Sequence, residues 1–302
     1  AKADLAMQRA NKLCRDTYSC YDNYIGEVQE QRRELEVGMR DAIEAREIVP
    51  FLQPLVSLRD GSLLGFEILA RWRHPQRGMI SPDSFISIAE DCGLISNLML
   101  SNLQQACETA AGWPGDFKIA VNLSPIQIMD RELADKVKAV CQSTGFPAER
   151  LEIEITEAIF ISDSDLAHVA ISELKALGVS VSLDDFGTGF SSMRYLSEFP
   201  IDKVKIDRSF VMGRDDNRKN EKIVNSIISL GHSLGMQTIA EGVEKQTDVE
   251  WLVEQGCDQA QGYLYSAPLA LPDALSFAKA GKRDNEARSP AAIPRRLAHL
   301  SD

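Results

Sequence analysis

Residues 151–184 read LEIEITEAIFISDSDLAHVAISELKALGVSVSLD, and this segment carries the pattern from which the fold can be predicted. Two short runs rich in Ile, Leu and Val, Leu151–Glu157 and Val179–Asp184, flank an amphipathic stretch, Asp163–Gly178, that closes with a glycine. Short apolar runs indicate buried strands, and a glycine at this position is typical of a helix end. The segment therefore predicts a strand, a helix and a second strand that is parallel to the first.

The same alternation extends outward in both directions, over about residues 47–280. Further strands are predicted at Val49–Leu58, Leu63–Trp72, Phe117–Leu123, Lys203–Ile206, Thr238–Glu241 and Gln259–Tyr265. Further helices are predicted at Pro82–Cys92, Ser96–Gly112, Arg131–Gly145, Lys219–Gly235 and Thr247–Gly256. Eight strands favour a closed barrel. Since four residues, Arg59-Asp60-Gly61-Ser62, separate the first two strands, one strand near the start should be antiparallel. We predict an α/β fold, a modified TIM (β/α)₈ barrel.

Composition limits the classes of partner. The 302 residues include 45 acidic and 33 basic side chains, a formal net charge of -12, which disfavours a nucleic acid polymer as partner. An anionic substrate would need local positive charge, and a metal ion held by carboxylates could supply it.

The six cysteines show no C-x-x-C spacing, so we expect free thiols in a reducing compartment. The sequence contains neither a signal peptide nor a long apolar span, which favours the cytoplasm. The first residue is alanine, so we expect the chain to be a part of a longer polypeptide, whose absent regions could anchor it to a membrane.

Polar side chains recur at the carboxyl ends of the predicted strands, where the active sites of parallel barrels lie. They are Glu67, Asn122, Glu154, Glu157, Asp184, Asp185, Lys205, Asp207, Glu241 and Gln261. Any one of these acids could simply cap a helix or face water. Several acids converging on one point would repel each other unless cations lay between them, which favours Mg²⁺ or Mn²⁺.

Two adjacent aspartates, Asp184 and Asp185, precede Phe-Gly-Thr-Gly-Phe. This arrangement suits two ions about 3.5–4 Å apart and phosphoryl chemistry. The four histidines do not pair at ligand spacing, which disfavours zinc. The Walker lysine pattern is missing, which disfavours a nucleoside triphosphatase.

Several motifs together resemble those of the EAL family of cyclic di-GMP phosphodiesterases, over roughly residues 48–275. They are Gln53-Pro54, Gly65-Phe66-Glu67-Ile68-Leu69-Ala70-Arg71-Trp72, Asn122-Leu123-Ser124, Glu154-Ile155-Thr156-Glu157, Asp184-Asp185-Phe186-Gly187-Thr188-Gly189, Lys205-Ile206-Asp207, Glu241-Gly242-Val243-Glu244 and Gln261-Gly262-Tyr263. One departure is Ile68, where the family usually has alanine. We expect Ile68 to point away from Glu67, so that packing changes and the metal site is kept.

The resemblance implies a role for each matching residue. One metal ion would be held by Glu67, Asn122, Glu154 and Asp184, and a second by Asp184 and Asp185 with Glu241. Lys205, Glu241 and Glu67 would be the catalytic residues, Lys205 orienting the attacking water. Glu157 would tether the loop 185–191. Substrate contacts or support would come from Gln53, Leu69, Arg71, Asp207, Glu244 and Gln261.

The ends of the chain have their own assignments. Residues 3–10 and 15–18 resemble the last helix and strand of a GGDEF diguanylate cyclase domain, so we expect residues 1–25 to be a remnant of one. Residues 26–47 are expected to form a linker helix, 48–280 the EAL barrel, and 281–302 a disordered tail. The resemblance further implies cyclic di-GMP as partner, a homodimer and an upstream GGDEF domain.

Hydrolysis of cyclic di-GMP to linear 5′-pGpG is the favoured function, with two alternatives left open. A degenerate barrel could bind cyclic di-GMP as a receptor without cleaving it, although such proteins typically lack metal ligands and every expected ligand is present here. An unrelated metal-dependent barrel enzyme would need a lysine or histidine base across the mouth.

Overall fold

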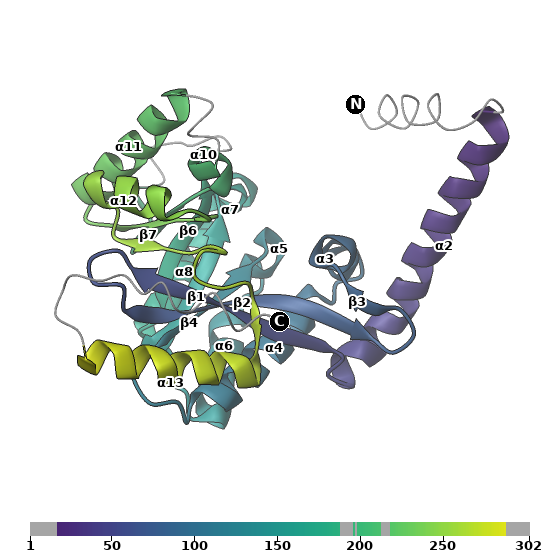
Figure 1. Ribbon diagram of the computed structural model, residues 1–302. Helices are drawn as coiled ribbons and strands as arrows, with labels where there is room; N and C mark the ends of the chain where they lie inside the picture. The colour runs from purple at the N-terminus through teal and green to yellow at the C-terminus, as the bar shows by residue number, and fades with distance from the viewer. Residues whose placement is uncertain (1–16, 188–195, 197, 213–217, 288–302) are drawn as a thin grey trace.

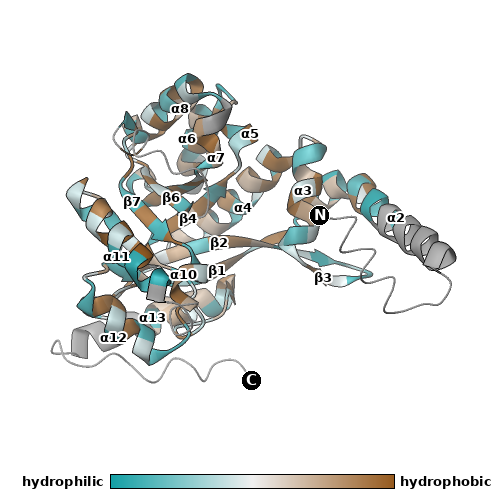
Figure 2. Ribbon diagram, turned by 90° about the horizontal axis from the view of Figure 1, so that it is seen from above, coloured by the Kyte–Doolittle hydropathy of each residue, from teal (hydrophilic) through white to brown (hydrophobic). Residues whose placement is uncertain are grey.

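The computed structural model describes residues 17–187, 196, 198–212 and 218–287. Its centre is a barrel, and the long helix α2 (Thr17–Glu44) extends away from it (Figures 1 and 2). The barrel strands are β1 (Ile48–Ser57), β2 (Leu63–His74), β4 (Lys118–Leu123), β5 (Leu151–Thr156), β6 (Ser180–Phe186), β7 (Lys203–Ile206), β8 (Gln237–Ala240) and β9 (Gln259–Ala260).

The barrel closes in the order β1-β9-β8-β7-β6-β5-β4-β2, and β2 returns to β1. Strand β1 is antiparallel to both of its barrel neighbours, while the pairs from β2 round to β9 are parallel. The predicted barrel with one antiparallel strand near the start is confirmed. Two short strands pair outside the closed ring, β3 (Gly78–Ile80) on β2 and β10 (Leu269–Ala270) on β1.

Helices cover the outside of the barrel. They are α3 (Pro82–Asp91), α4 (Ile95–Ala110), α5 (Pro125–Ile128), α6 (Leu133–Thr144), α7 (Ala158–Ser162), α8 (Ser164–Ala176), α10 (Arg208–Met212), α11 (Arg218–Ser233), α12 (Gln246–Glu254) and α13 (Leu271–Ala287). Because side chains alternate along a strand, Ile153 and Ile155 face these helices and are fully buried, whereas Glu152 and Glu154 point into the barrel. The apolar core thus lies between strands and helices, and the barrel interior is polar.

The strand predicted over Gln259–Tyr265 is wrong beyond Ala260. The chain turns at Gly262, where a Cβ atom would lie 2.1 Å from the Val243 carbonyl oxygen. Leu264 N donates to that oxygen at 3.0 Å, and Tyr265 N donates to the Gly262 carbonyl at 3.1 Å. The glycine allows this close backbone contact, which ends the strand.

Helix α2 runs without a break across the predicted boundary between residues 25 and 26. Its last turns bury Leu35, Met39 and Ile43 in a second apolar cluster with Trp72 and Phe85. The helix is therefore part of the folded body at its carboxyl end. Residues 1–16, which hold most of the expected GGDEF remnant, lie outside the described residues.

At the other end, α13 continues to Ala287, past residue 280, where the barrel domain was expected to end. Residues 288–302, the rest of the predicted tail, lie outside the described residues. Within the described ranges, the helices lack the combination of length and apolar composition that crossing a bilayer requires.

Candidate active site

The carboxyl ends of the parallel strands open into a cavity of about 590 Å³, which we call the upper mouth. Ten of the residues predicted from the sequence line it: Gln53, Glu67, Leu69, Arg71, Asp184, Asp185, Asp207, Glu241, Glu244 and Gln261. These ten residues come from six separate segments and share one cavity, as expected for a parallel barrel.

Lys205 lies at the centre of the acidic residues and is 1% exposed. Its Nζ is 2.7 Å from Glu154 Oε2, 2.7 Å from Glu241 Oε1, 3.2 Å from Asp184 Oδ1 and 3.7 Å from Glu67 Oε2. One ammonium group thus holds four carboxylates together. The sequence analysis expected Mg²⁺ or Mn²⁺ between these acids. The structure shows that the Lys205 ammonium also lies among them and offsets part of their charge.

Glu67 is held from two sides by neutral amides. Asn122 Nδ2 donates to Glu67 Oε1 at 2.7 Å, and Gln261 Nε2 donates to Glu67 Oε2 at 2.7 Å. The Gln261 amide also donates to Gln53 Oε1 at 3.0 Å. These contacts link strands β1, β2 and β4 to the chain after β9 and fix the Glu67 carboxylate inside the mouth.

Asp184 and Asp185 both reach the mouth because strand β6 is irregular at this point. Successive strand residues normally point to opposite faces, so two adjacent aspartates should diverge. The pairing of β6 with β7 shifts register between Leu183 and Phe186, and Asp185 takes a left-handed backbone with φ 53°. A non-glycine residue in this conformation is uncommon and is retained where the surrounding structure requires it.

The carboxylates carry more negative charge than Lys205 can balance. Burial raises the pKa of Glu154 well above its usual value, and the charges of Glu67 and Asp184 add to the shift. Burial also raises the pKa of Glu241 to about 7, again with help from the neighbouring carboxylates. The pKa of Asp185 is raised by burial and by Asp184. Burial lowers the pKa of Lys205, but its four carboxylates raise it well above the usual value.

This donor set fits divalent cations. Asp184, Asp185 and Glu241 each offer an oxygen, and the three oxygens lie within 4.8 Å of one another. Carboxylate oxygens with a surplus of negative charge are the ligands that Mg²⁺ and Mn²⁺ prefer. A second ion would draw on Glu67, Asn122 and Glu154 together with Asp184.

Glu157 lies beside the mouth at the end of β5. Its Oε1 accepts a hydrogen bond from Gly187 N at 3.2 Å. The contact joins the end of β5 to the start of the loop after β6, and the tether of that loop stays a prediction. Residues 188–191 of that loop lie outside the described residues.

Three lining residues with polar side chains were not assigned a role from the sequence: Asp83, Arg208 and Tyr263. Tyr263 is 67% exposed and belongs to the motif Gln261-Gly262-Tyr263, and this motif could have indicated its place in the cavity. Arg208 follows Asp207 directly and could have been noticed for that reason. Asp83 lies in the first turn of α3, and nothing in its sequence context indicates that it lines the mouth. Ile68 is buried in the core outside the barrel, away from Glu67, as predicted.

Comparison with known proteins agrees with this geometry, since residues 37–268 match the EAL domain. The chain belongs to the EAL family. It is 40% identical to the uncharacterized protein y4lL of Sinorhizobium fredii over 92% of this chain and 34% of that protein. It is 35% identical to the bifunctional diguanylate cyclase/cyclic di-GMP phosphodiesterase MucR of Pseudomonas aeruginosa, over 91% of this chain and 41% of that protein.

The EAL fold also matches a solved structure described as the PaMucR phosphodiesterase in complex with c-di-GMP. The TM-score is 0.76 at 36% identity, covering 80% of this chain and 99% of that one. The chain spans about a third to two fifths of the length of the curated relatives named above.

Proposed function

We propose that this EAL domain hydrolyses one phosphodiester bond of cyclic di-GMP, releases linear 5′-pGpG and so lowers the level of the second messenger. The observation that carries the proposal is the group of carboxylates around Lys205, in a cavity that also contains Arg71. The names of MucR and of its c-di-GMP complex support the choice of substrate.

In the proposed reaction a water oxygen bonds to phosphorus while the bond from phosphorus to the ribose 3′-oxygen breaks. The 3′-oxygen leaves as a hydroxyl group, and the phosphate stays on the 5′-oxygen of the other nucleotide. Two divalent ions, when bound, would lower the pKa of the water and neutralise charge on the phosphoryl oxygens. We assign one ion to Glu67, Asn122, Glu154 and Asp184, and the other to Asp184, Asp185 and Glu241.

Side chains of the protein orient the water, accept its proton and bind the substrate in the proposed reaction. Lys205 orients the attacking water by donating a hydrogen bond to it. Glu241, whose carboxylate lies 2.7 Å from Lys205 Nζ, accepts the proton that the attacking water releases. Arg71 offers a planar guanidinium that can donate two hydrogen bonds to a phosphate. Gln53, Leu69, Asp207, Glu244 and Gln261 line the cavity and are assigned to substrate contact or support.

The test is to incubate the chain with cyclic di-GMP and Mg²⁺ or Mn²⁺ and to separate the products by chromatography. We expect pGpG from the natural sequence and none from Glu67→Ala, which removes the carboxylate that Asn122 and Gln261 hold. Glu254→Ala, an exposed acid at the end of α12, is the matched control and should retain full turnover. Binding of cyclic di-GMP without pGpG would favour the receptor alternative, and normal turnover by Glu67→Ala would contradict the metal assignment.

Three further assignments stay proposals. We propose a homodimer, an upstream GGDEF domain in the longer protein, and a cytoplasmic location. The word "bifunctional" in the name of MucR supports the second, because that protein combines a cyclase with a phosphodiesterase.

A further inference from the structure

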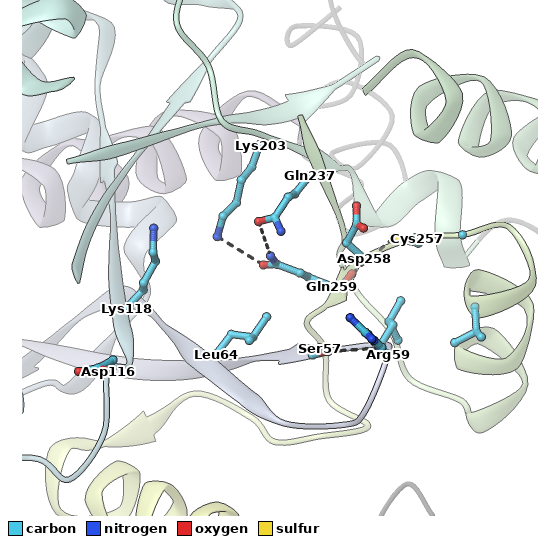
Figure 3. A pocket seen from close by; sticks show the side chains of 13 residues that line it. Ser57, Arg59, Leu64, Asp116, Lys118, Lys203, Gln237, Cys257, Asp258 and Gln259 are labelled. Atoms are coloured by element: carbon cyan, nitrogen blue, oxygen red, sulfur yellow. Dashed lines mark hydrogen bonds between the residues drawn. The ribbon is translucent and has the colours of Figure 1, made fainter. Parts of the chain in front are cut away.

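The opposite end of the barrel holds a second cavity, of about 640 Å³, which we call the lower mouth. It opens where the parallel strands begin. Lys118, Lys203, Gln237 and Gln259 are the first residues of β4, β7, β8 and β9, and all four line this cavity. Figure 3 shows Lys203, Gln237 and Gln259 turned toward one another, with Lys118 across the cavity. The lower mouth and the upper mouth lie at opposite ends of the strands and share no lining residue.

Several acceptors at this end of the barrel already contact groups of the protein. Lys203 Nζ lies 2.7 Å from Glu152 Oε2, and both side chains are buried. Asp258 Oδ2 accepts from Thr238 N at 2.8 Å and from Thr238 Oγ1 at 2.9 Å, and lies 3.0 Å from His232 Nε2. The Gln259 and Gln237 side chains share a hydrogen bond of 3.0 Å through the Gln237 oxygen. Asp258 and the Gln237 oxygen are therefore engaged. Asp116, the other carboxylate in the lining, is exposed and forms no ion pair among the described residues.

The donors, in contrast, keep hydrogens to spare. The Lys118 ammonium donates to Ser180 Oγ and has two further N–H groups. The Gln237 amide nitrogen makes no hydrogen bond to any other residue that the structure describes, and Gln237 is exposed at the rim. Arg59 lines the same cavity and forms no ion pair among the described residues. Three cations line the cavity, Arg59, Lys118 and Lys203, against the two carboxylates Asp116 and Asp258. Burial lowers the pKa of Lys118; the charge of Lys203 lowers it further, while Glu152 and Asp202 raise it.

We infer that the lower mouth is a second ligand site, which binds a small molecule through a carboxylate or phosphate group. Lys118 supplies the charge, Lys203 supports it from the buried side, and the Gln237 amide and Arg59 donate from the rim. Charge-assisted hydrogen bonds to an oxyanion are the strong ones in such a site. The apolar lining from Leu58, Leu64 and Val253 would contact the rest of the ligand.

The experiment is calorimetric titration of the whole chain, free of divalent metal, with inorganic phosphate in one arm and succinate in the other. We expect saturable binding in at least one arm, and the arm that binds identifies the preferred group. Lys118→Gln should weaken binding about tenfold or more, because a hydrogen bond to a charged group is lost. Gln237→Glu should weaken it further, since it places a carboxylate beside the anion.

Two controls locate the effect. Lys138→Gln removes the same charge from an exposed position of α6, and Arg71→Gln removes a cation from the upper mouth. Both should bind like the natural sequence, and thermal melting should show that all four variants are folded. Absence of saturable binding in both arms would overturn the inference. So would a loss that follows Arg71→Gln or Lys138→Gln instead of the lower-mouth variants.

Discussion

The two mouths of the barrel are built from the same strands and differ in charge. At the upper mouth Lys205 of β7 contacts Glu154 of β5 and three further carboxylates. At the lower mouth Lys203 of β7 contacts Glu152 of β5, its one carboxylate partner in the described part of the chain. The two lysine–glutamate pairs are two residues apart, about 6.6 Å along a strand. The fold is the same at both mouths, so the residues that surround each pair determine which ligand fits.

A surplus of carboxylates therefore makes the upper mouth a site for cations, while spare donors make the lower mouth a site for anions. In the upper mouth Lys205 is one of several charged side chains that we assign to the reaction. In the lower mouth the ion pair stabilises the fold and leaves Lys118 available.

The largest expected effect comes from removing the central cation of the upper mouth. Lys205→Met should reduce hydrolysis of cyclic di-GMP about 10²- to 10⁴-fold, because the water loses its orienting donor and the carboxylates lose their counterion. Steady-state turnover with saturating Mn²⁺ measures this. Lys118→Met at the lower mouth is the control and should turn over normally. Equal activity of the two variants would contradict the assignment of hydrolysis to the upper mouth.

The matching change at the lower mouth should affect stability. Lys203→Met leaves Glu152 buried without its partner and should cost about 3–5 kcal/mol of unfolding free energy. The double change Lys203→Met with Glu152→Leu should recover most of this loss, since both charges are then gone. Urea unfolding of the three proteins measures the difference. If the double variant were as unstable as the single one, the unpaired charge of Glu152 would not be the cause of the lost stability.

Divalent ions should stabilise the folded chain through the upper mouth. An ion present at a hundred times its Kd adds about 2.7 kcal/mol to the unfolding free energy. Melting curves with and without Mn²⁺ should show the increase for the natural sequence and much less of it for Asp185→Asn. Lys118→Gln should gain as much as the natural sequence, because the lower mouth holds no metal ligands in our assignment. Loss of the gain in Lys118→Gln would contradict the separation of the two sites.

The smallest effect concerns thiol reactivity at the lower mouth. Cys257 lines that cavity, yet its side chain is buried and burial raises its pKa to about 11. Cys92 is exposed. Iodoacetamide at pH 8 should therefore alkylate Cys257 at least ~10-fold more slowly than Cys92, because the thiolate is the reactive form. Peptide mass mapping over time measures both rates. Comparable rates would mean that the lower mouth opens more widely than the structure shows.

Sequence reasoning was most successful where a residue's place follows from strand periodicity. Asp184 and Glu241 stand at or near strand ends, and Glu67 lies next to Ile68, where the parallel pairing of β2 with β4 ends. A parallel barrel brings such positions to one mouth. It was least successful where backbone irregularity decides the outcome. The turn at Gly262 shortened an expected strand, and the register shift before Phe186 brought Asp185 to the mouth beside Asp184. Local pattern does not reveal such contacts, because they depend on a partner strand.

The alternation of strands and helices, the antiparallel start and the set of acids follow from the amino-acid sequence, because each depends on neighbouring residues or on a motif. How these acids divide between the two mouths follows from the three-dimensional fold. Glu152 and Glu154 share one face of β5 and look equivalent in the sequence. In the structure Glu152 pairs with Lys203 near the lower mouth, whereas Glu154 is one of the carboxylates around Lys205. The position of a side chain along the barrel axis depends on the register of every strand, and no single segment of the sequence contains that information.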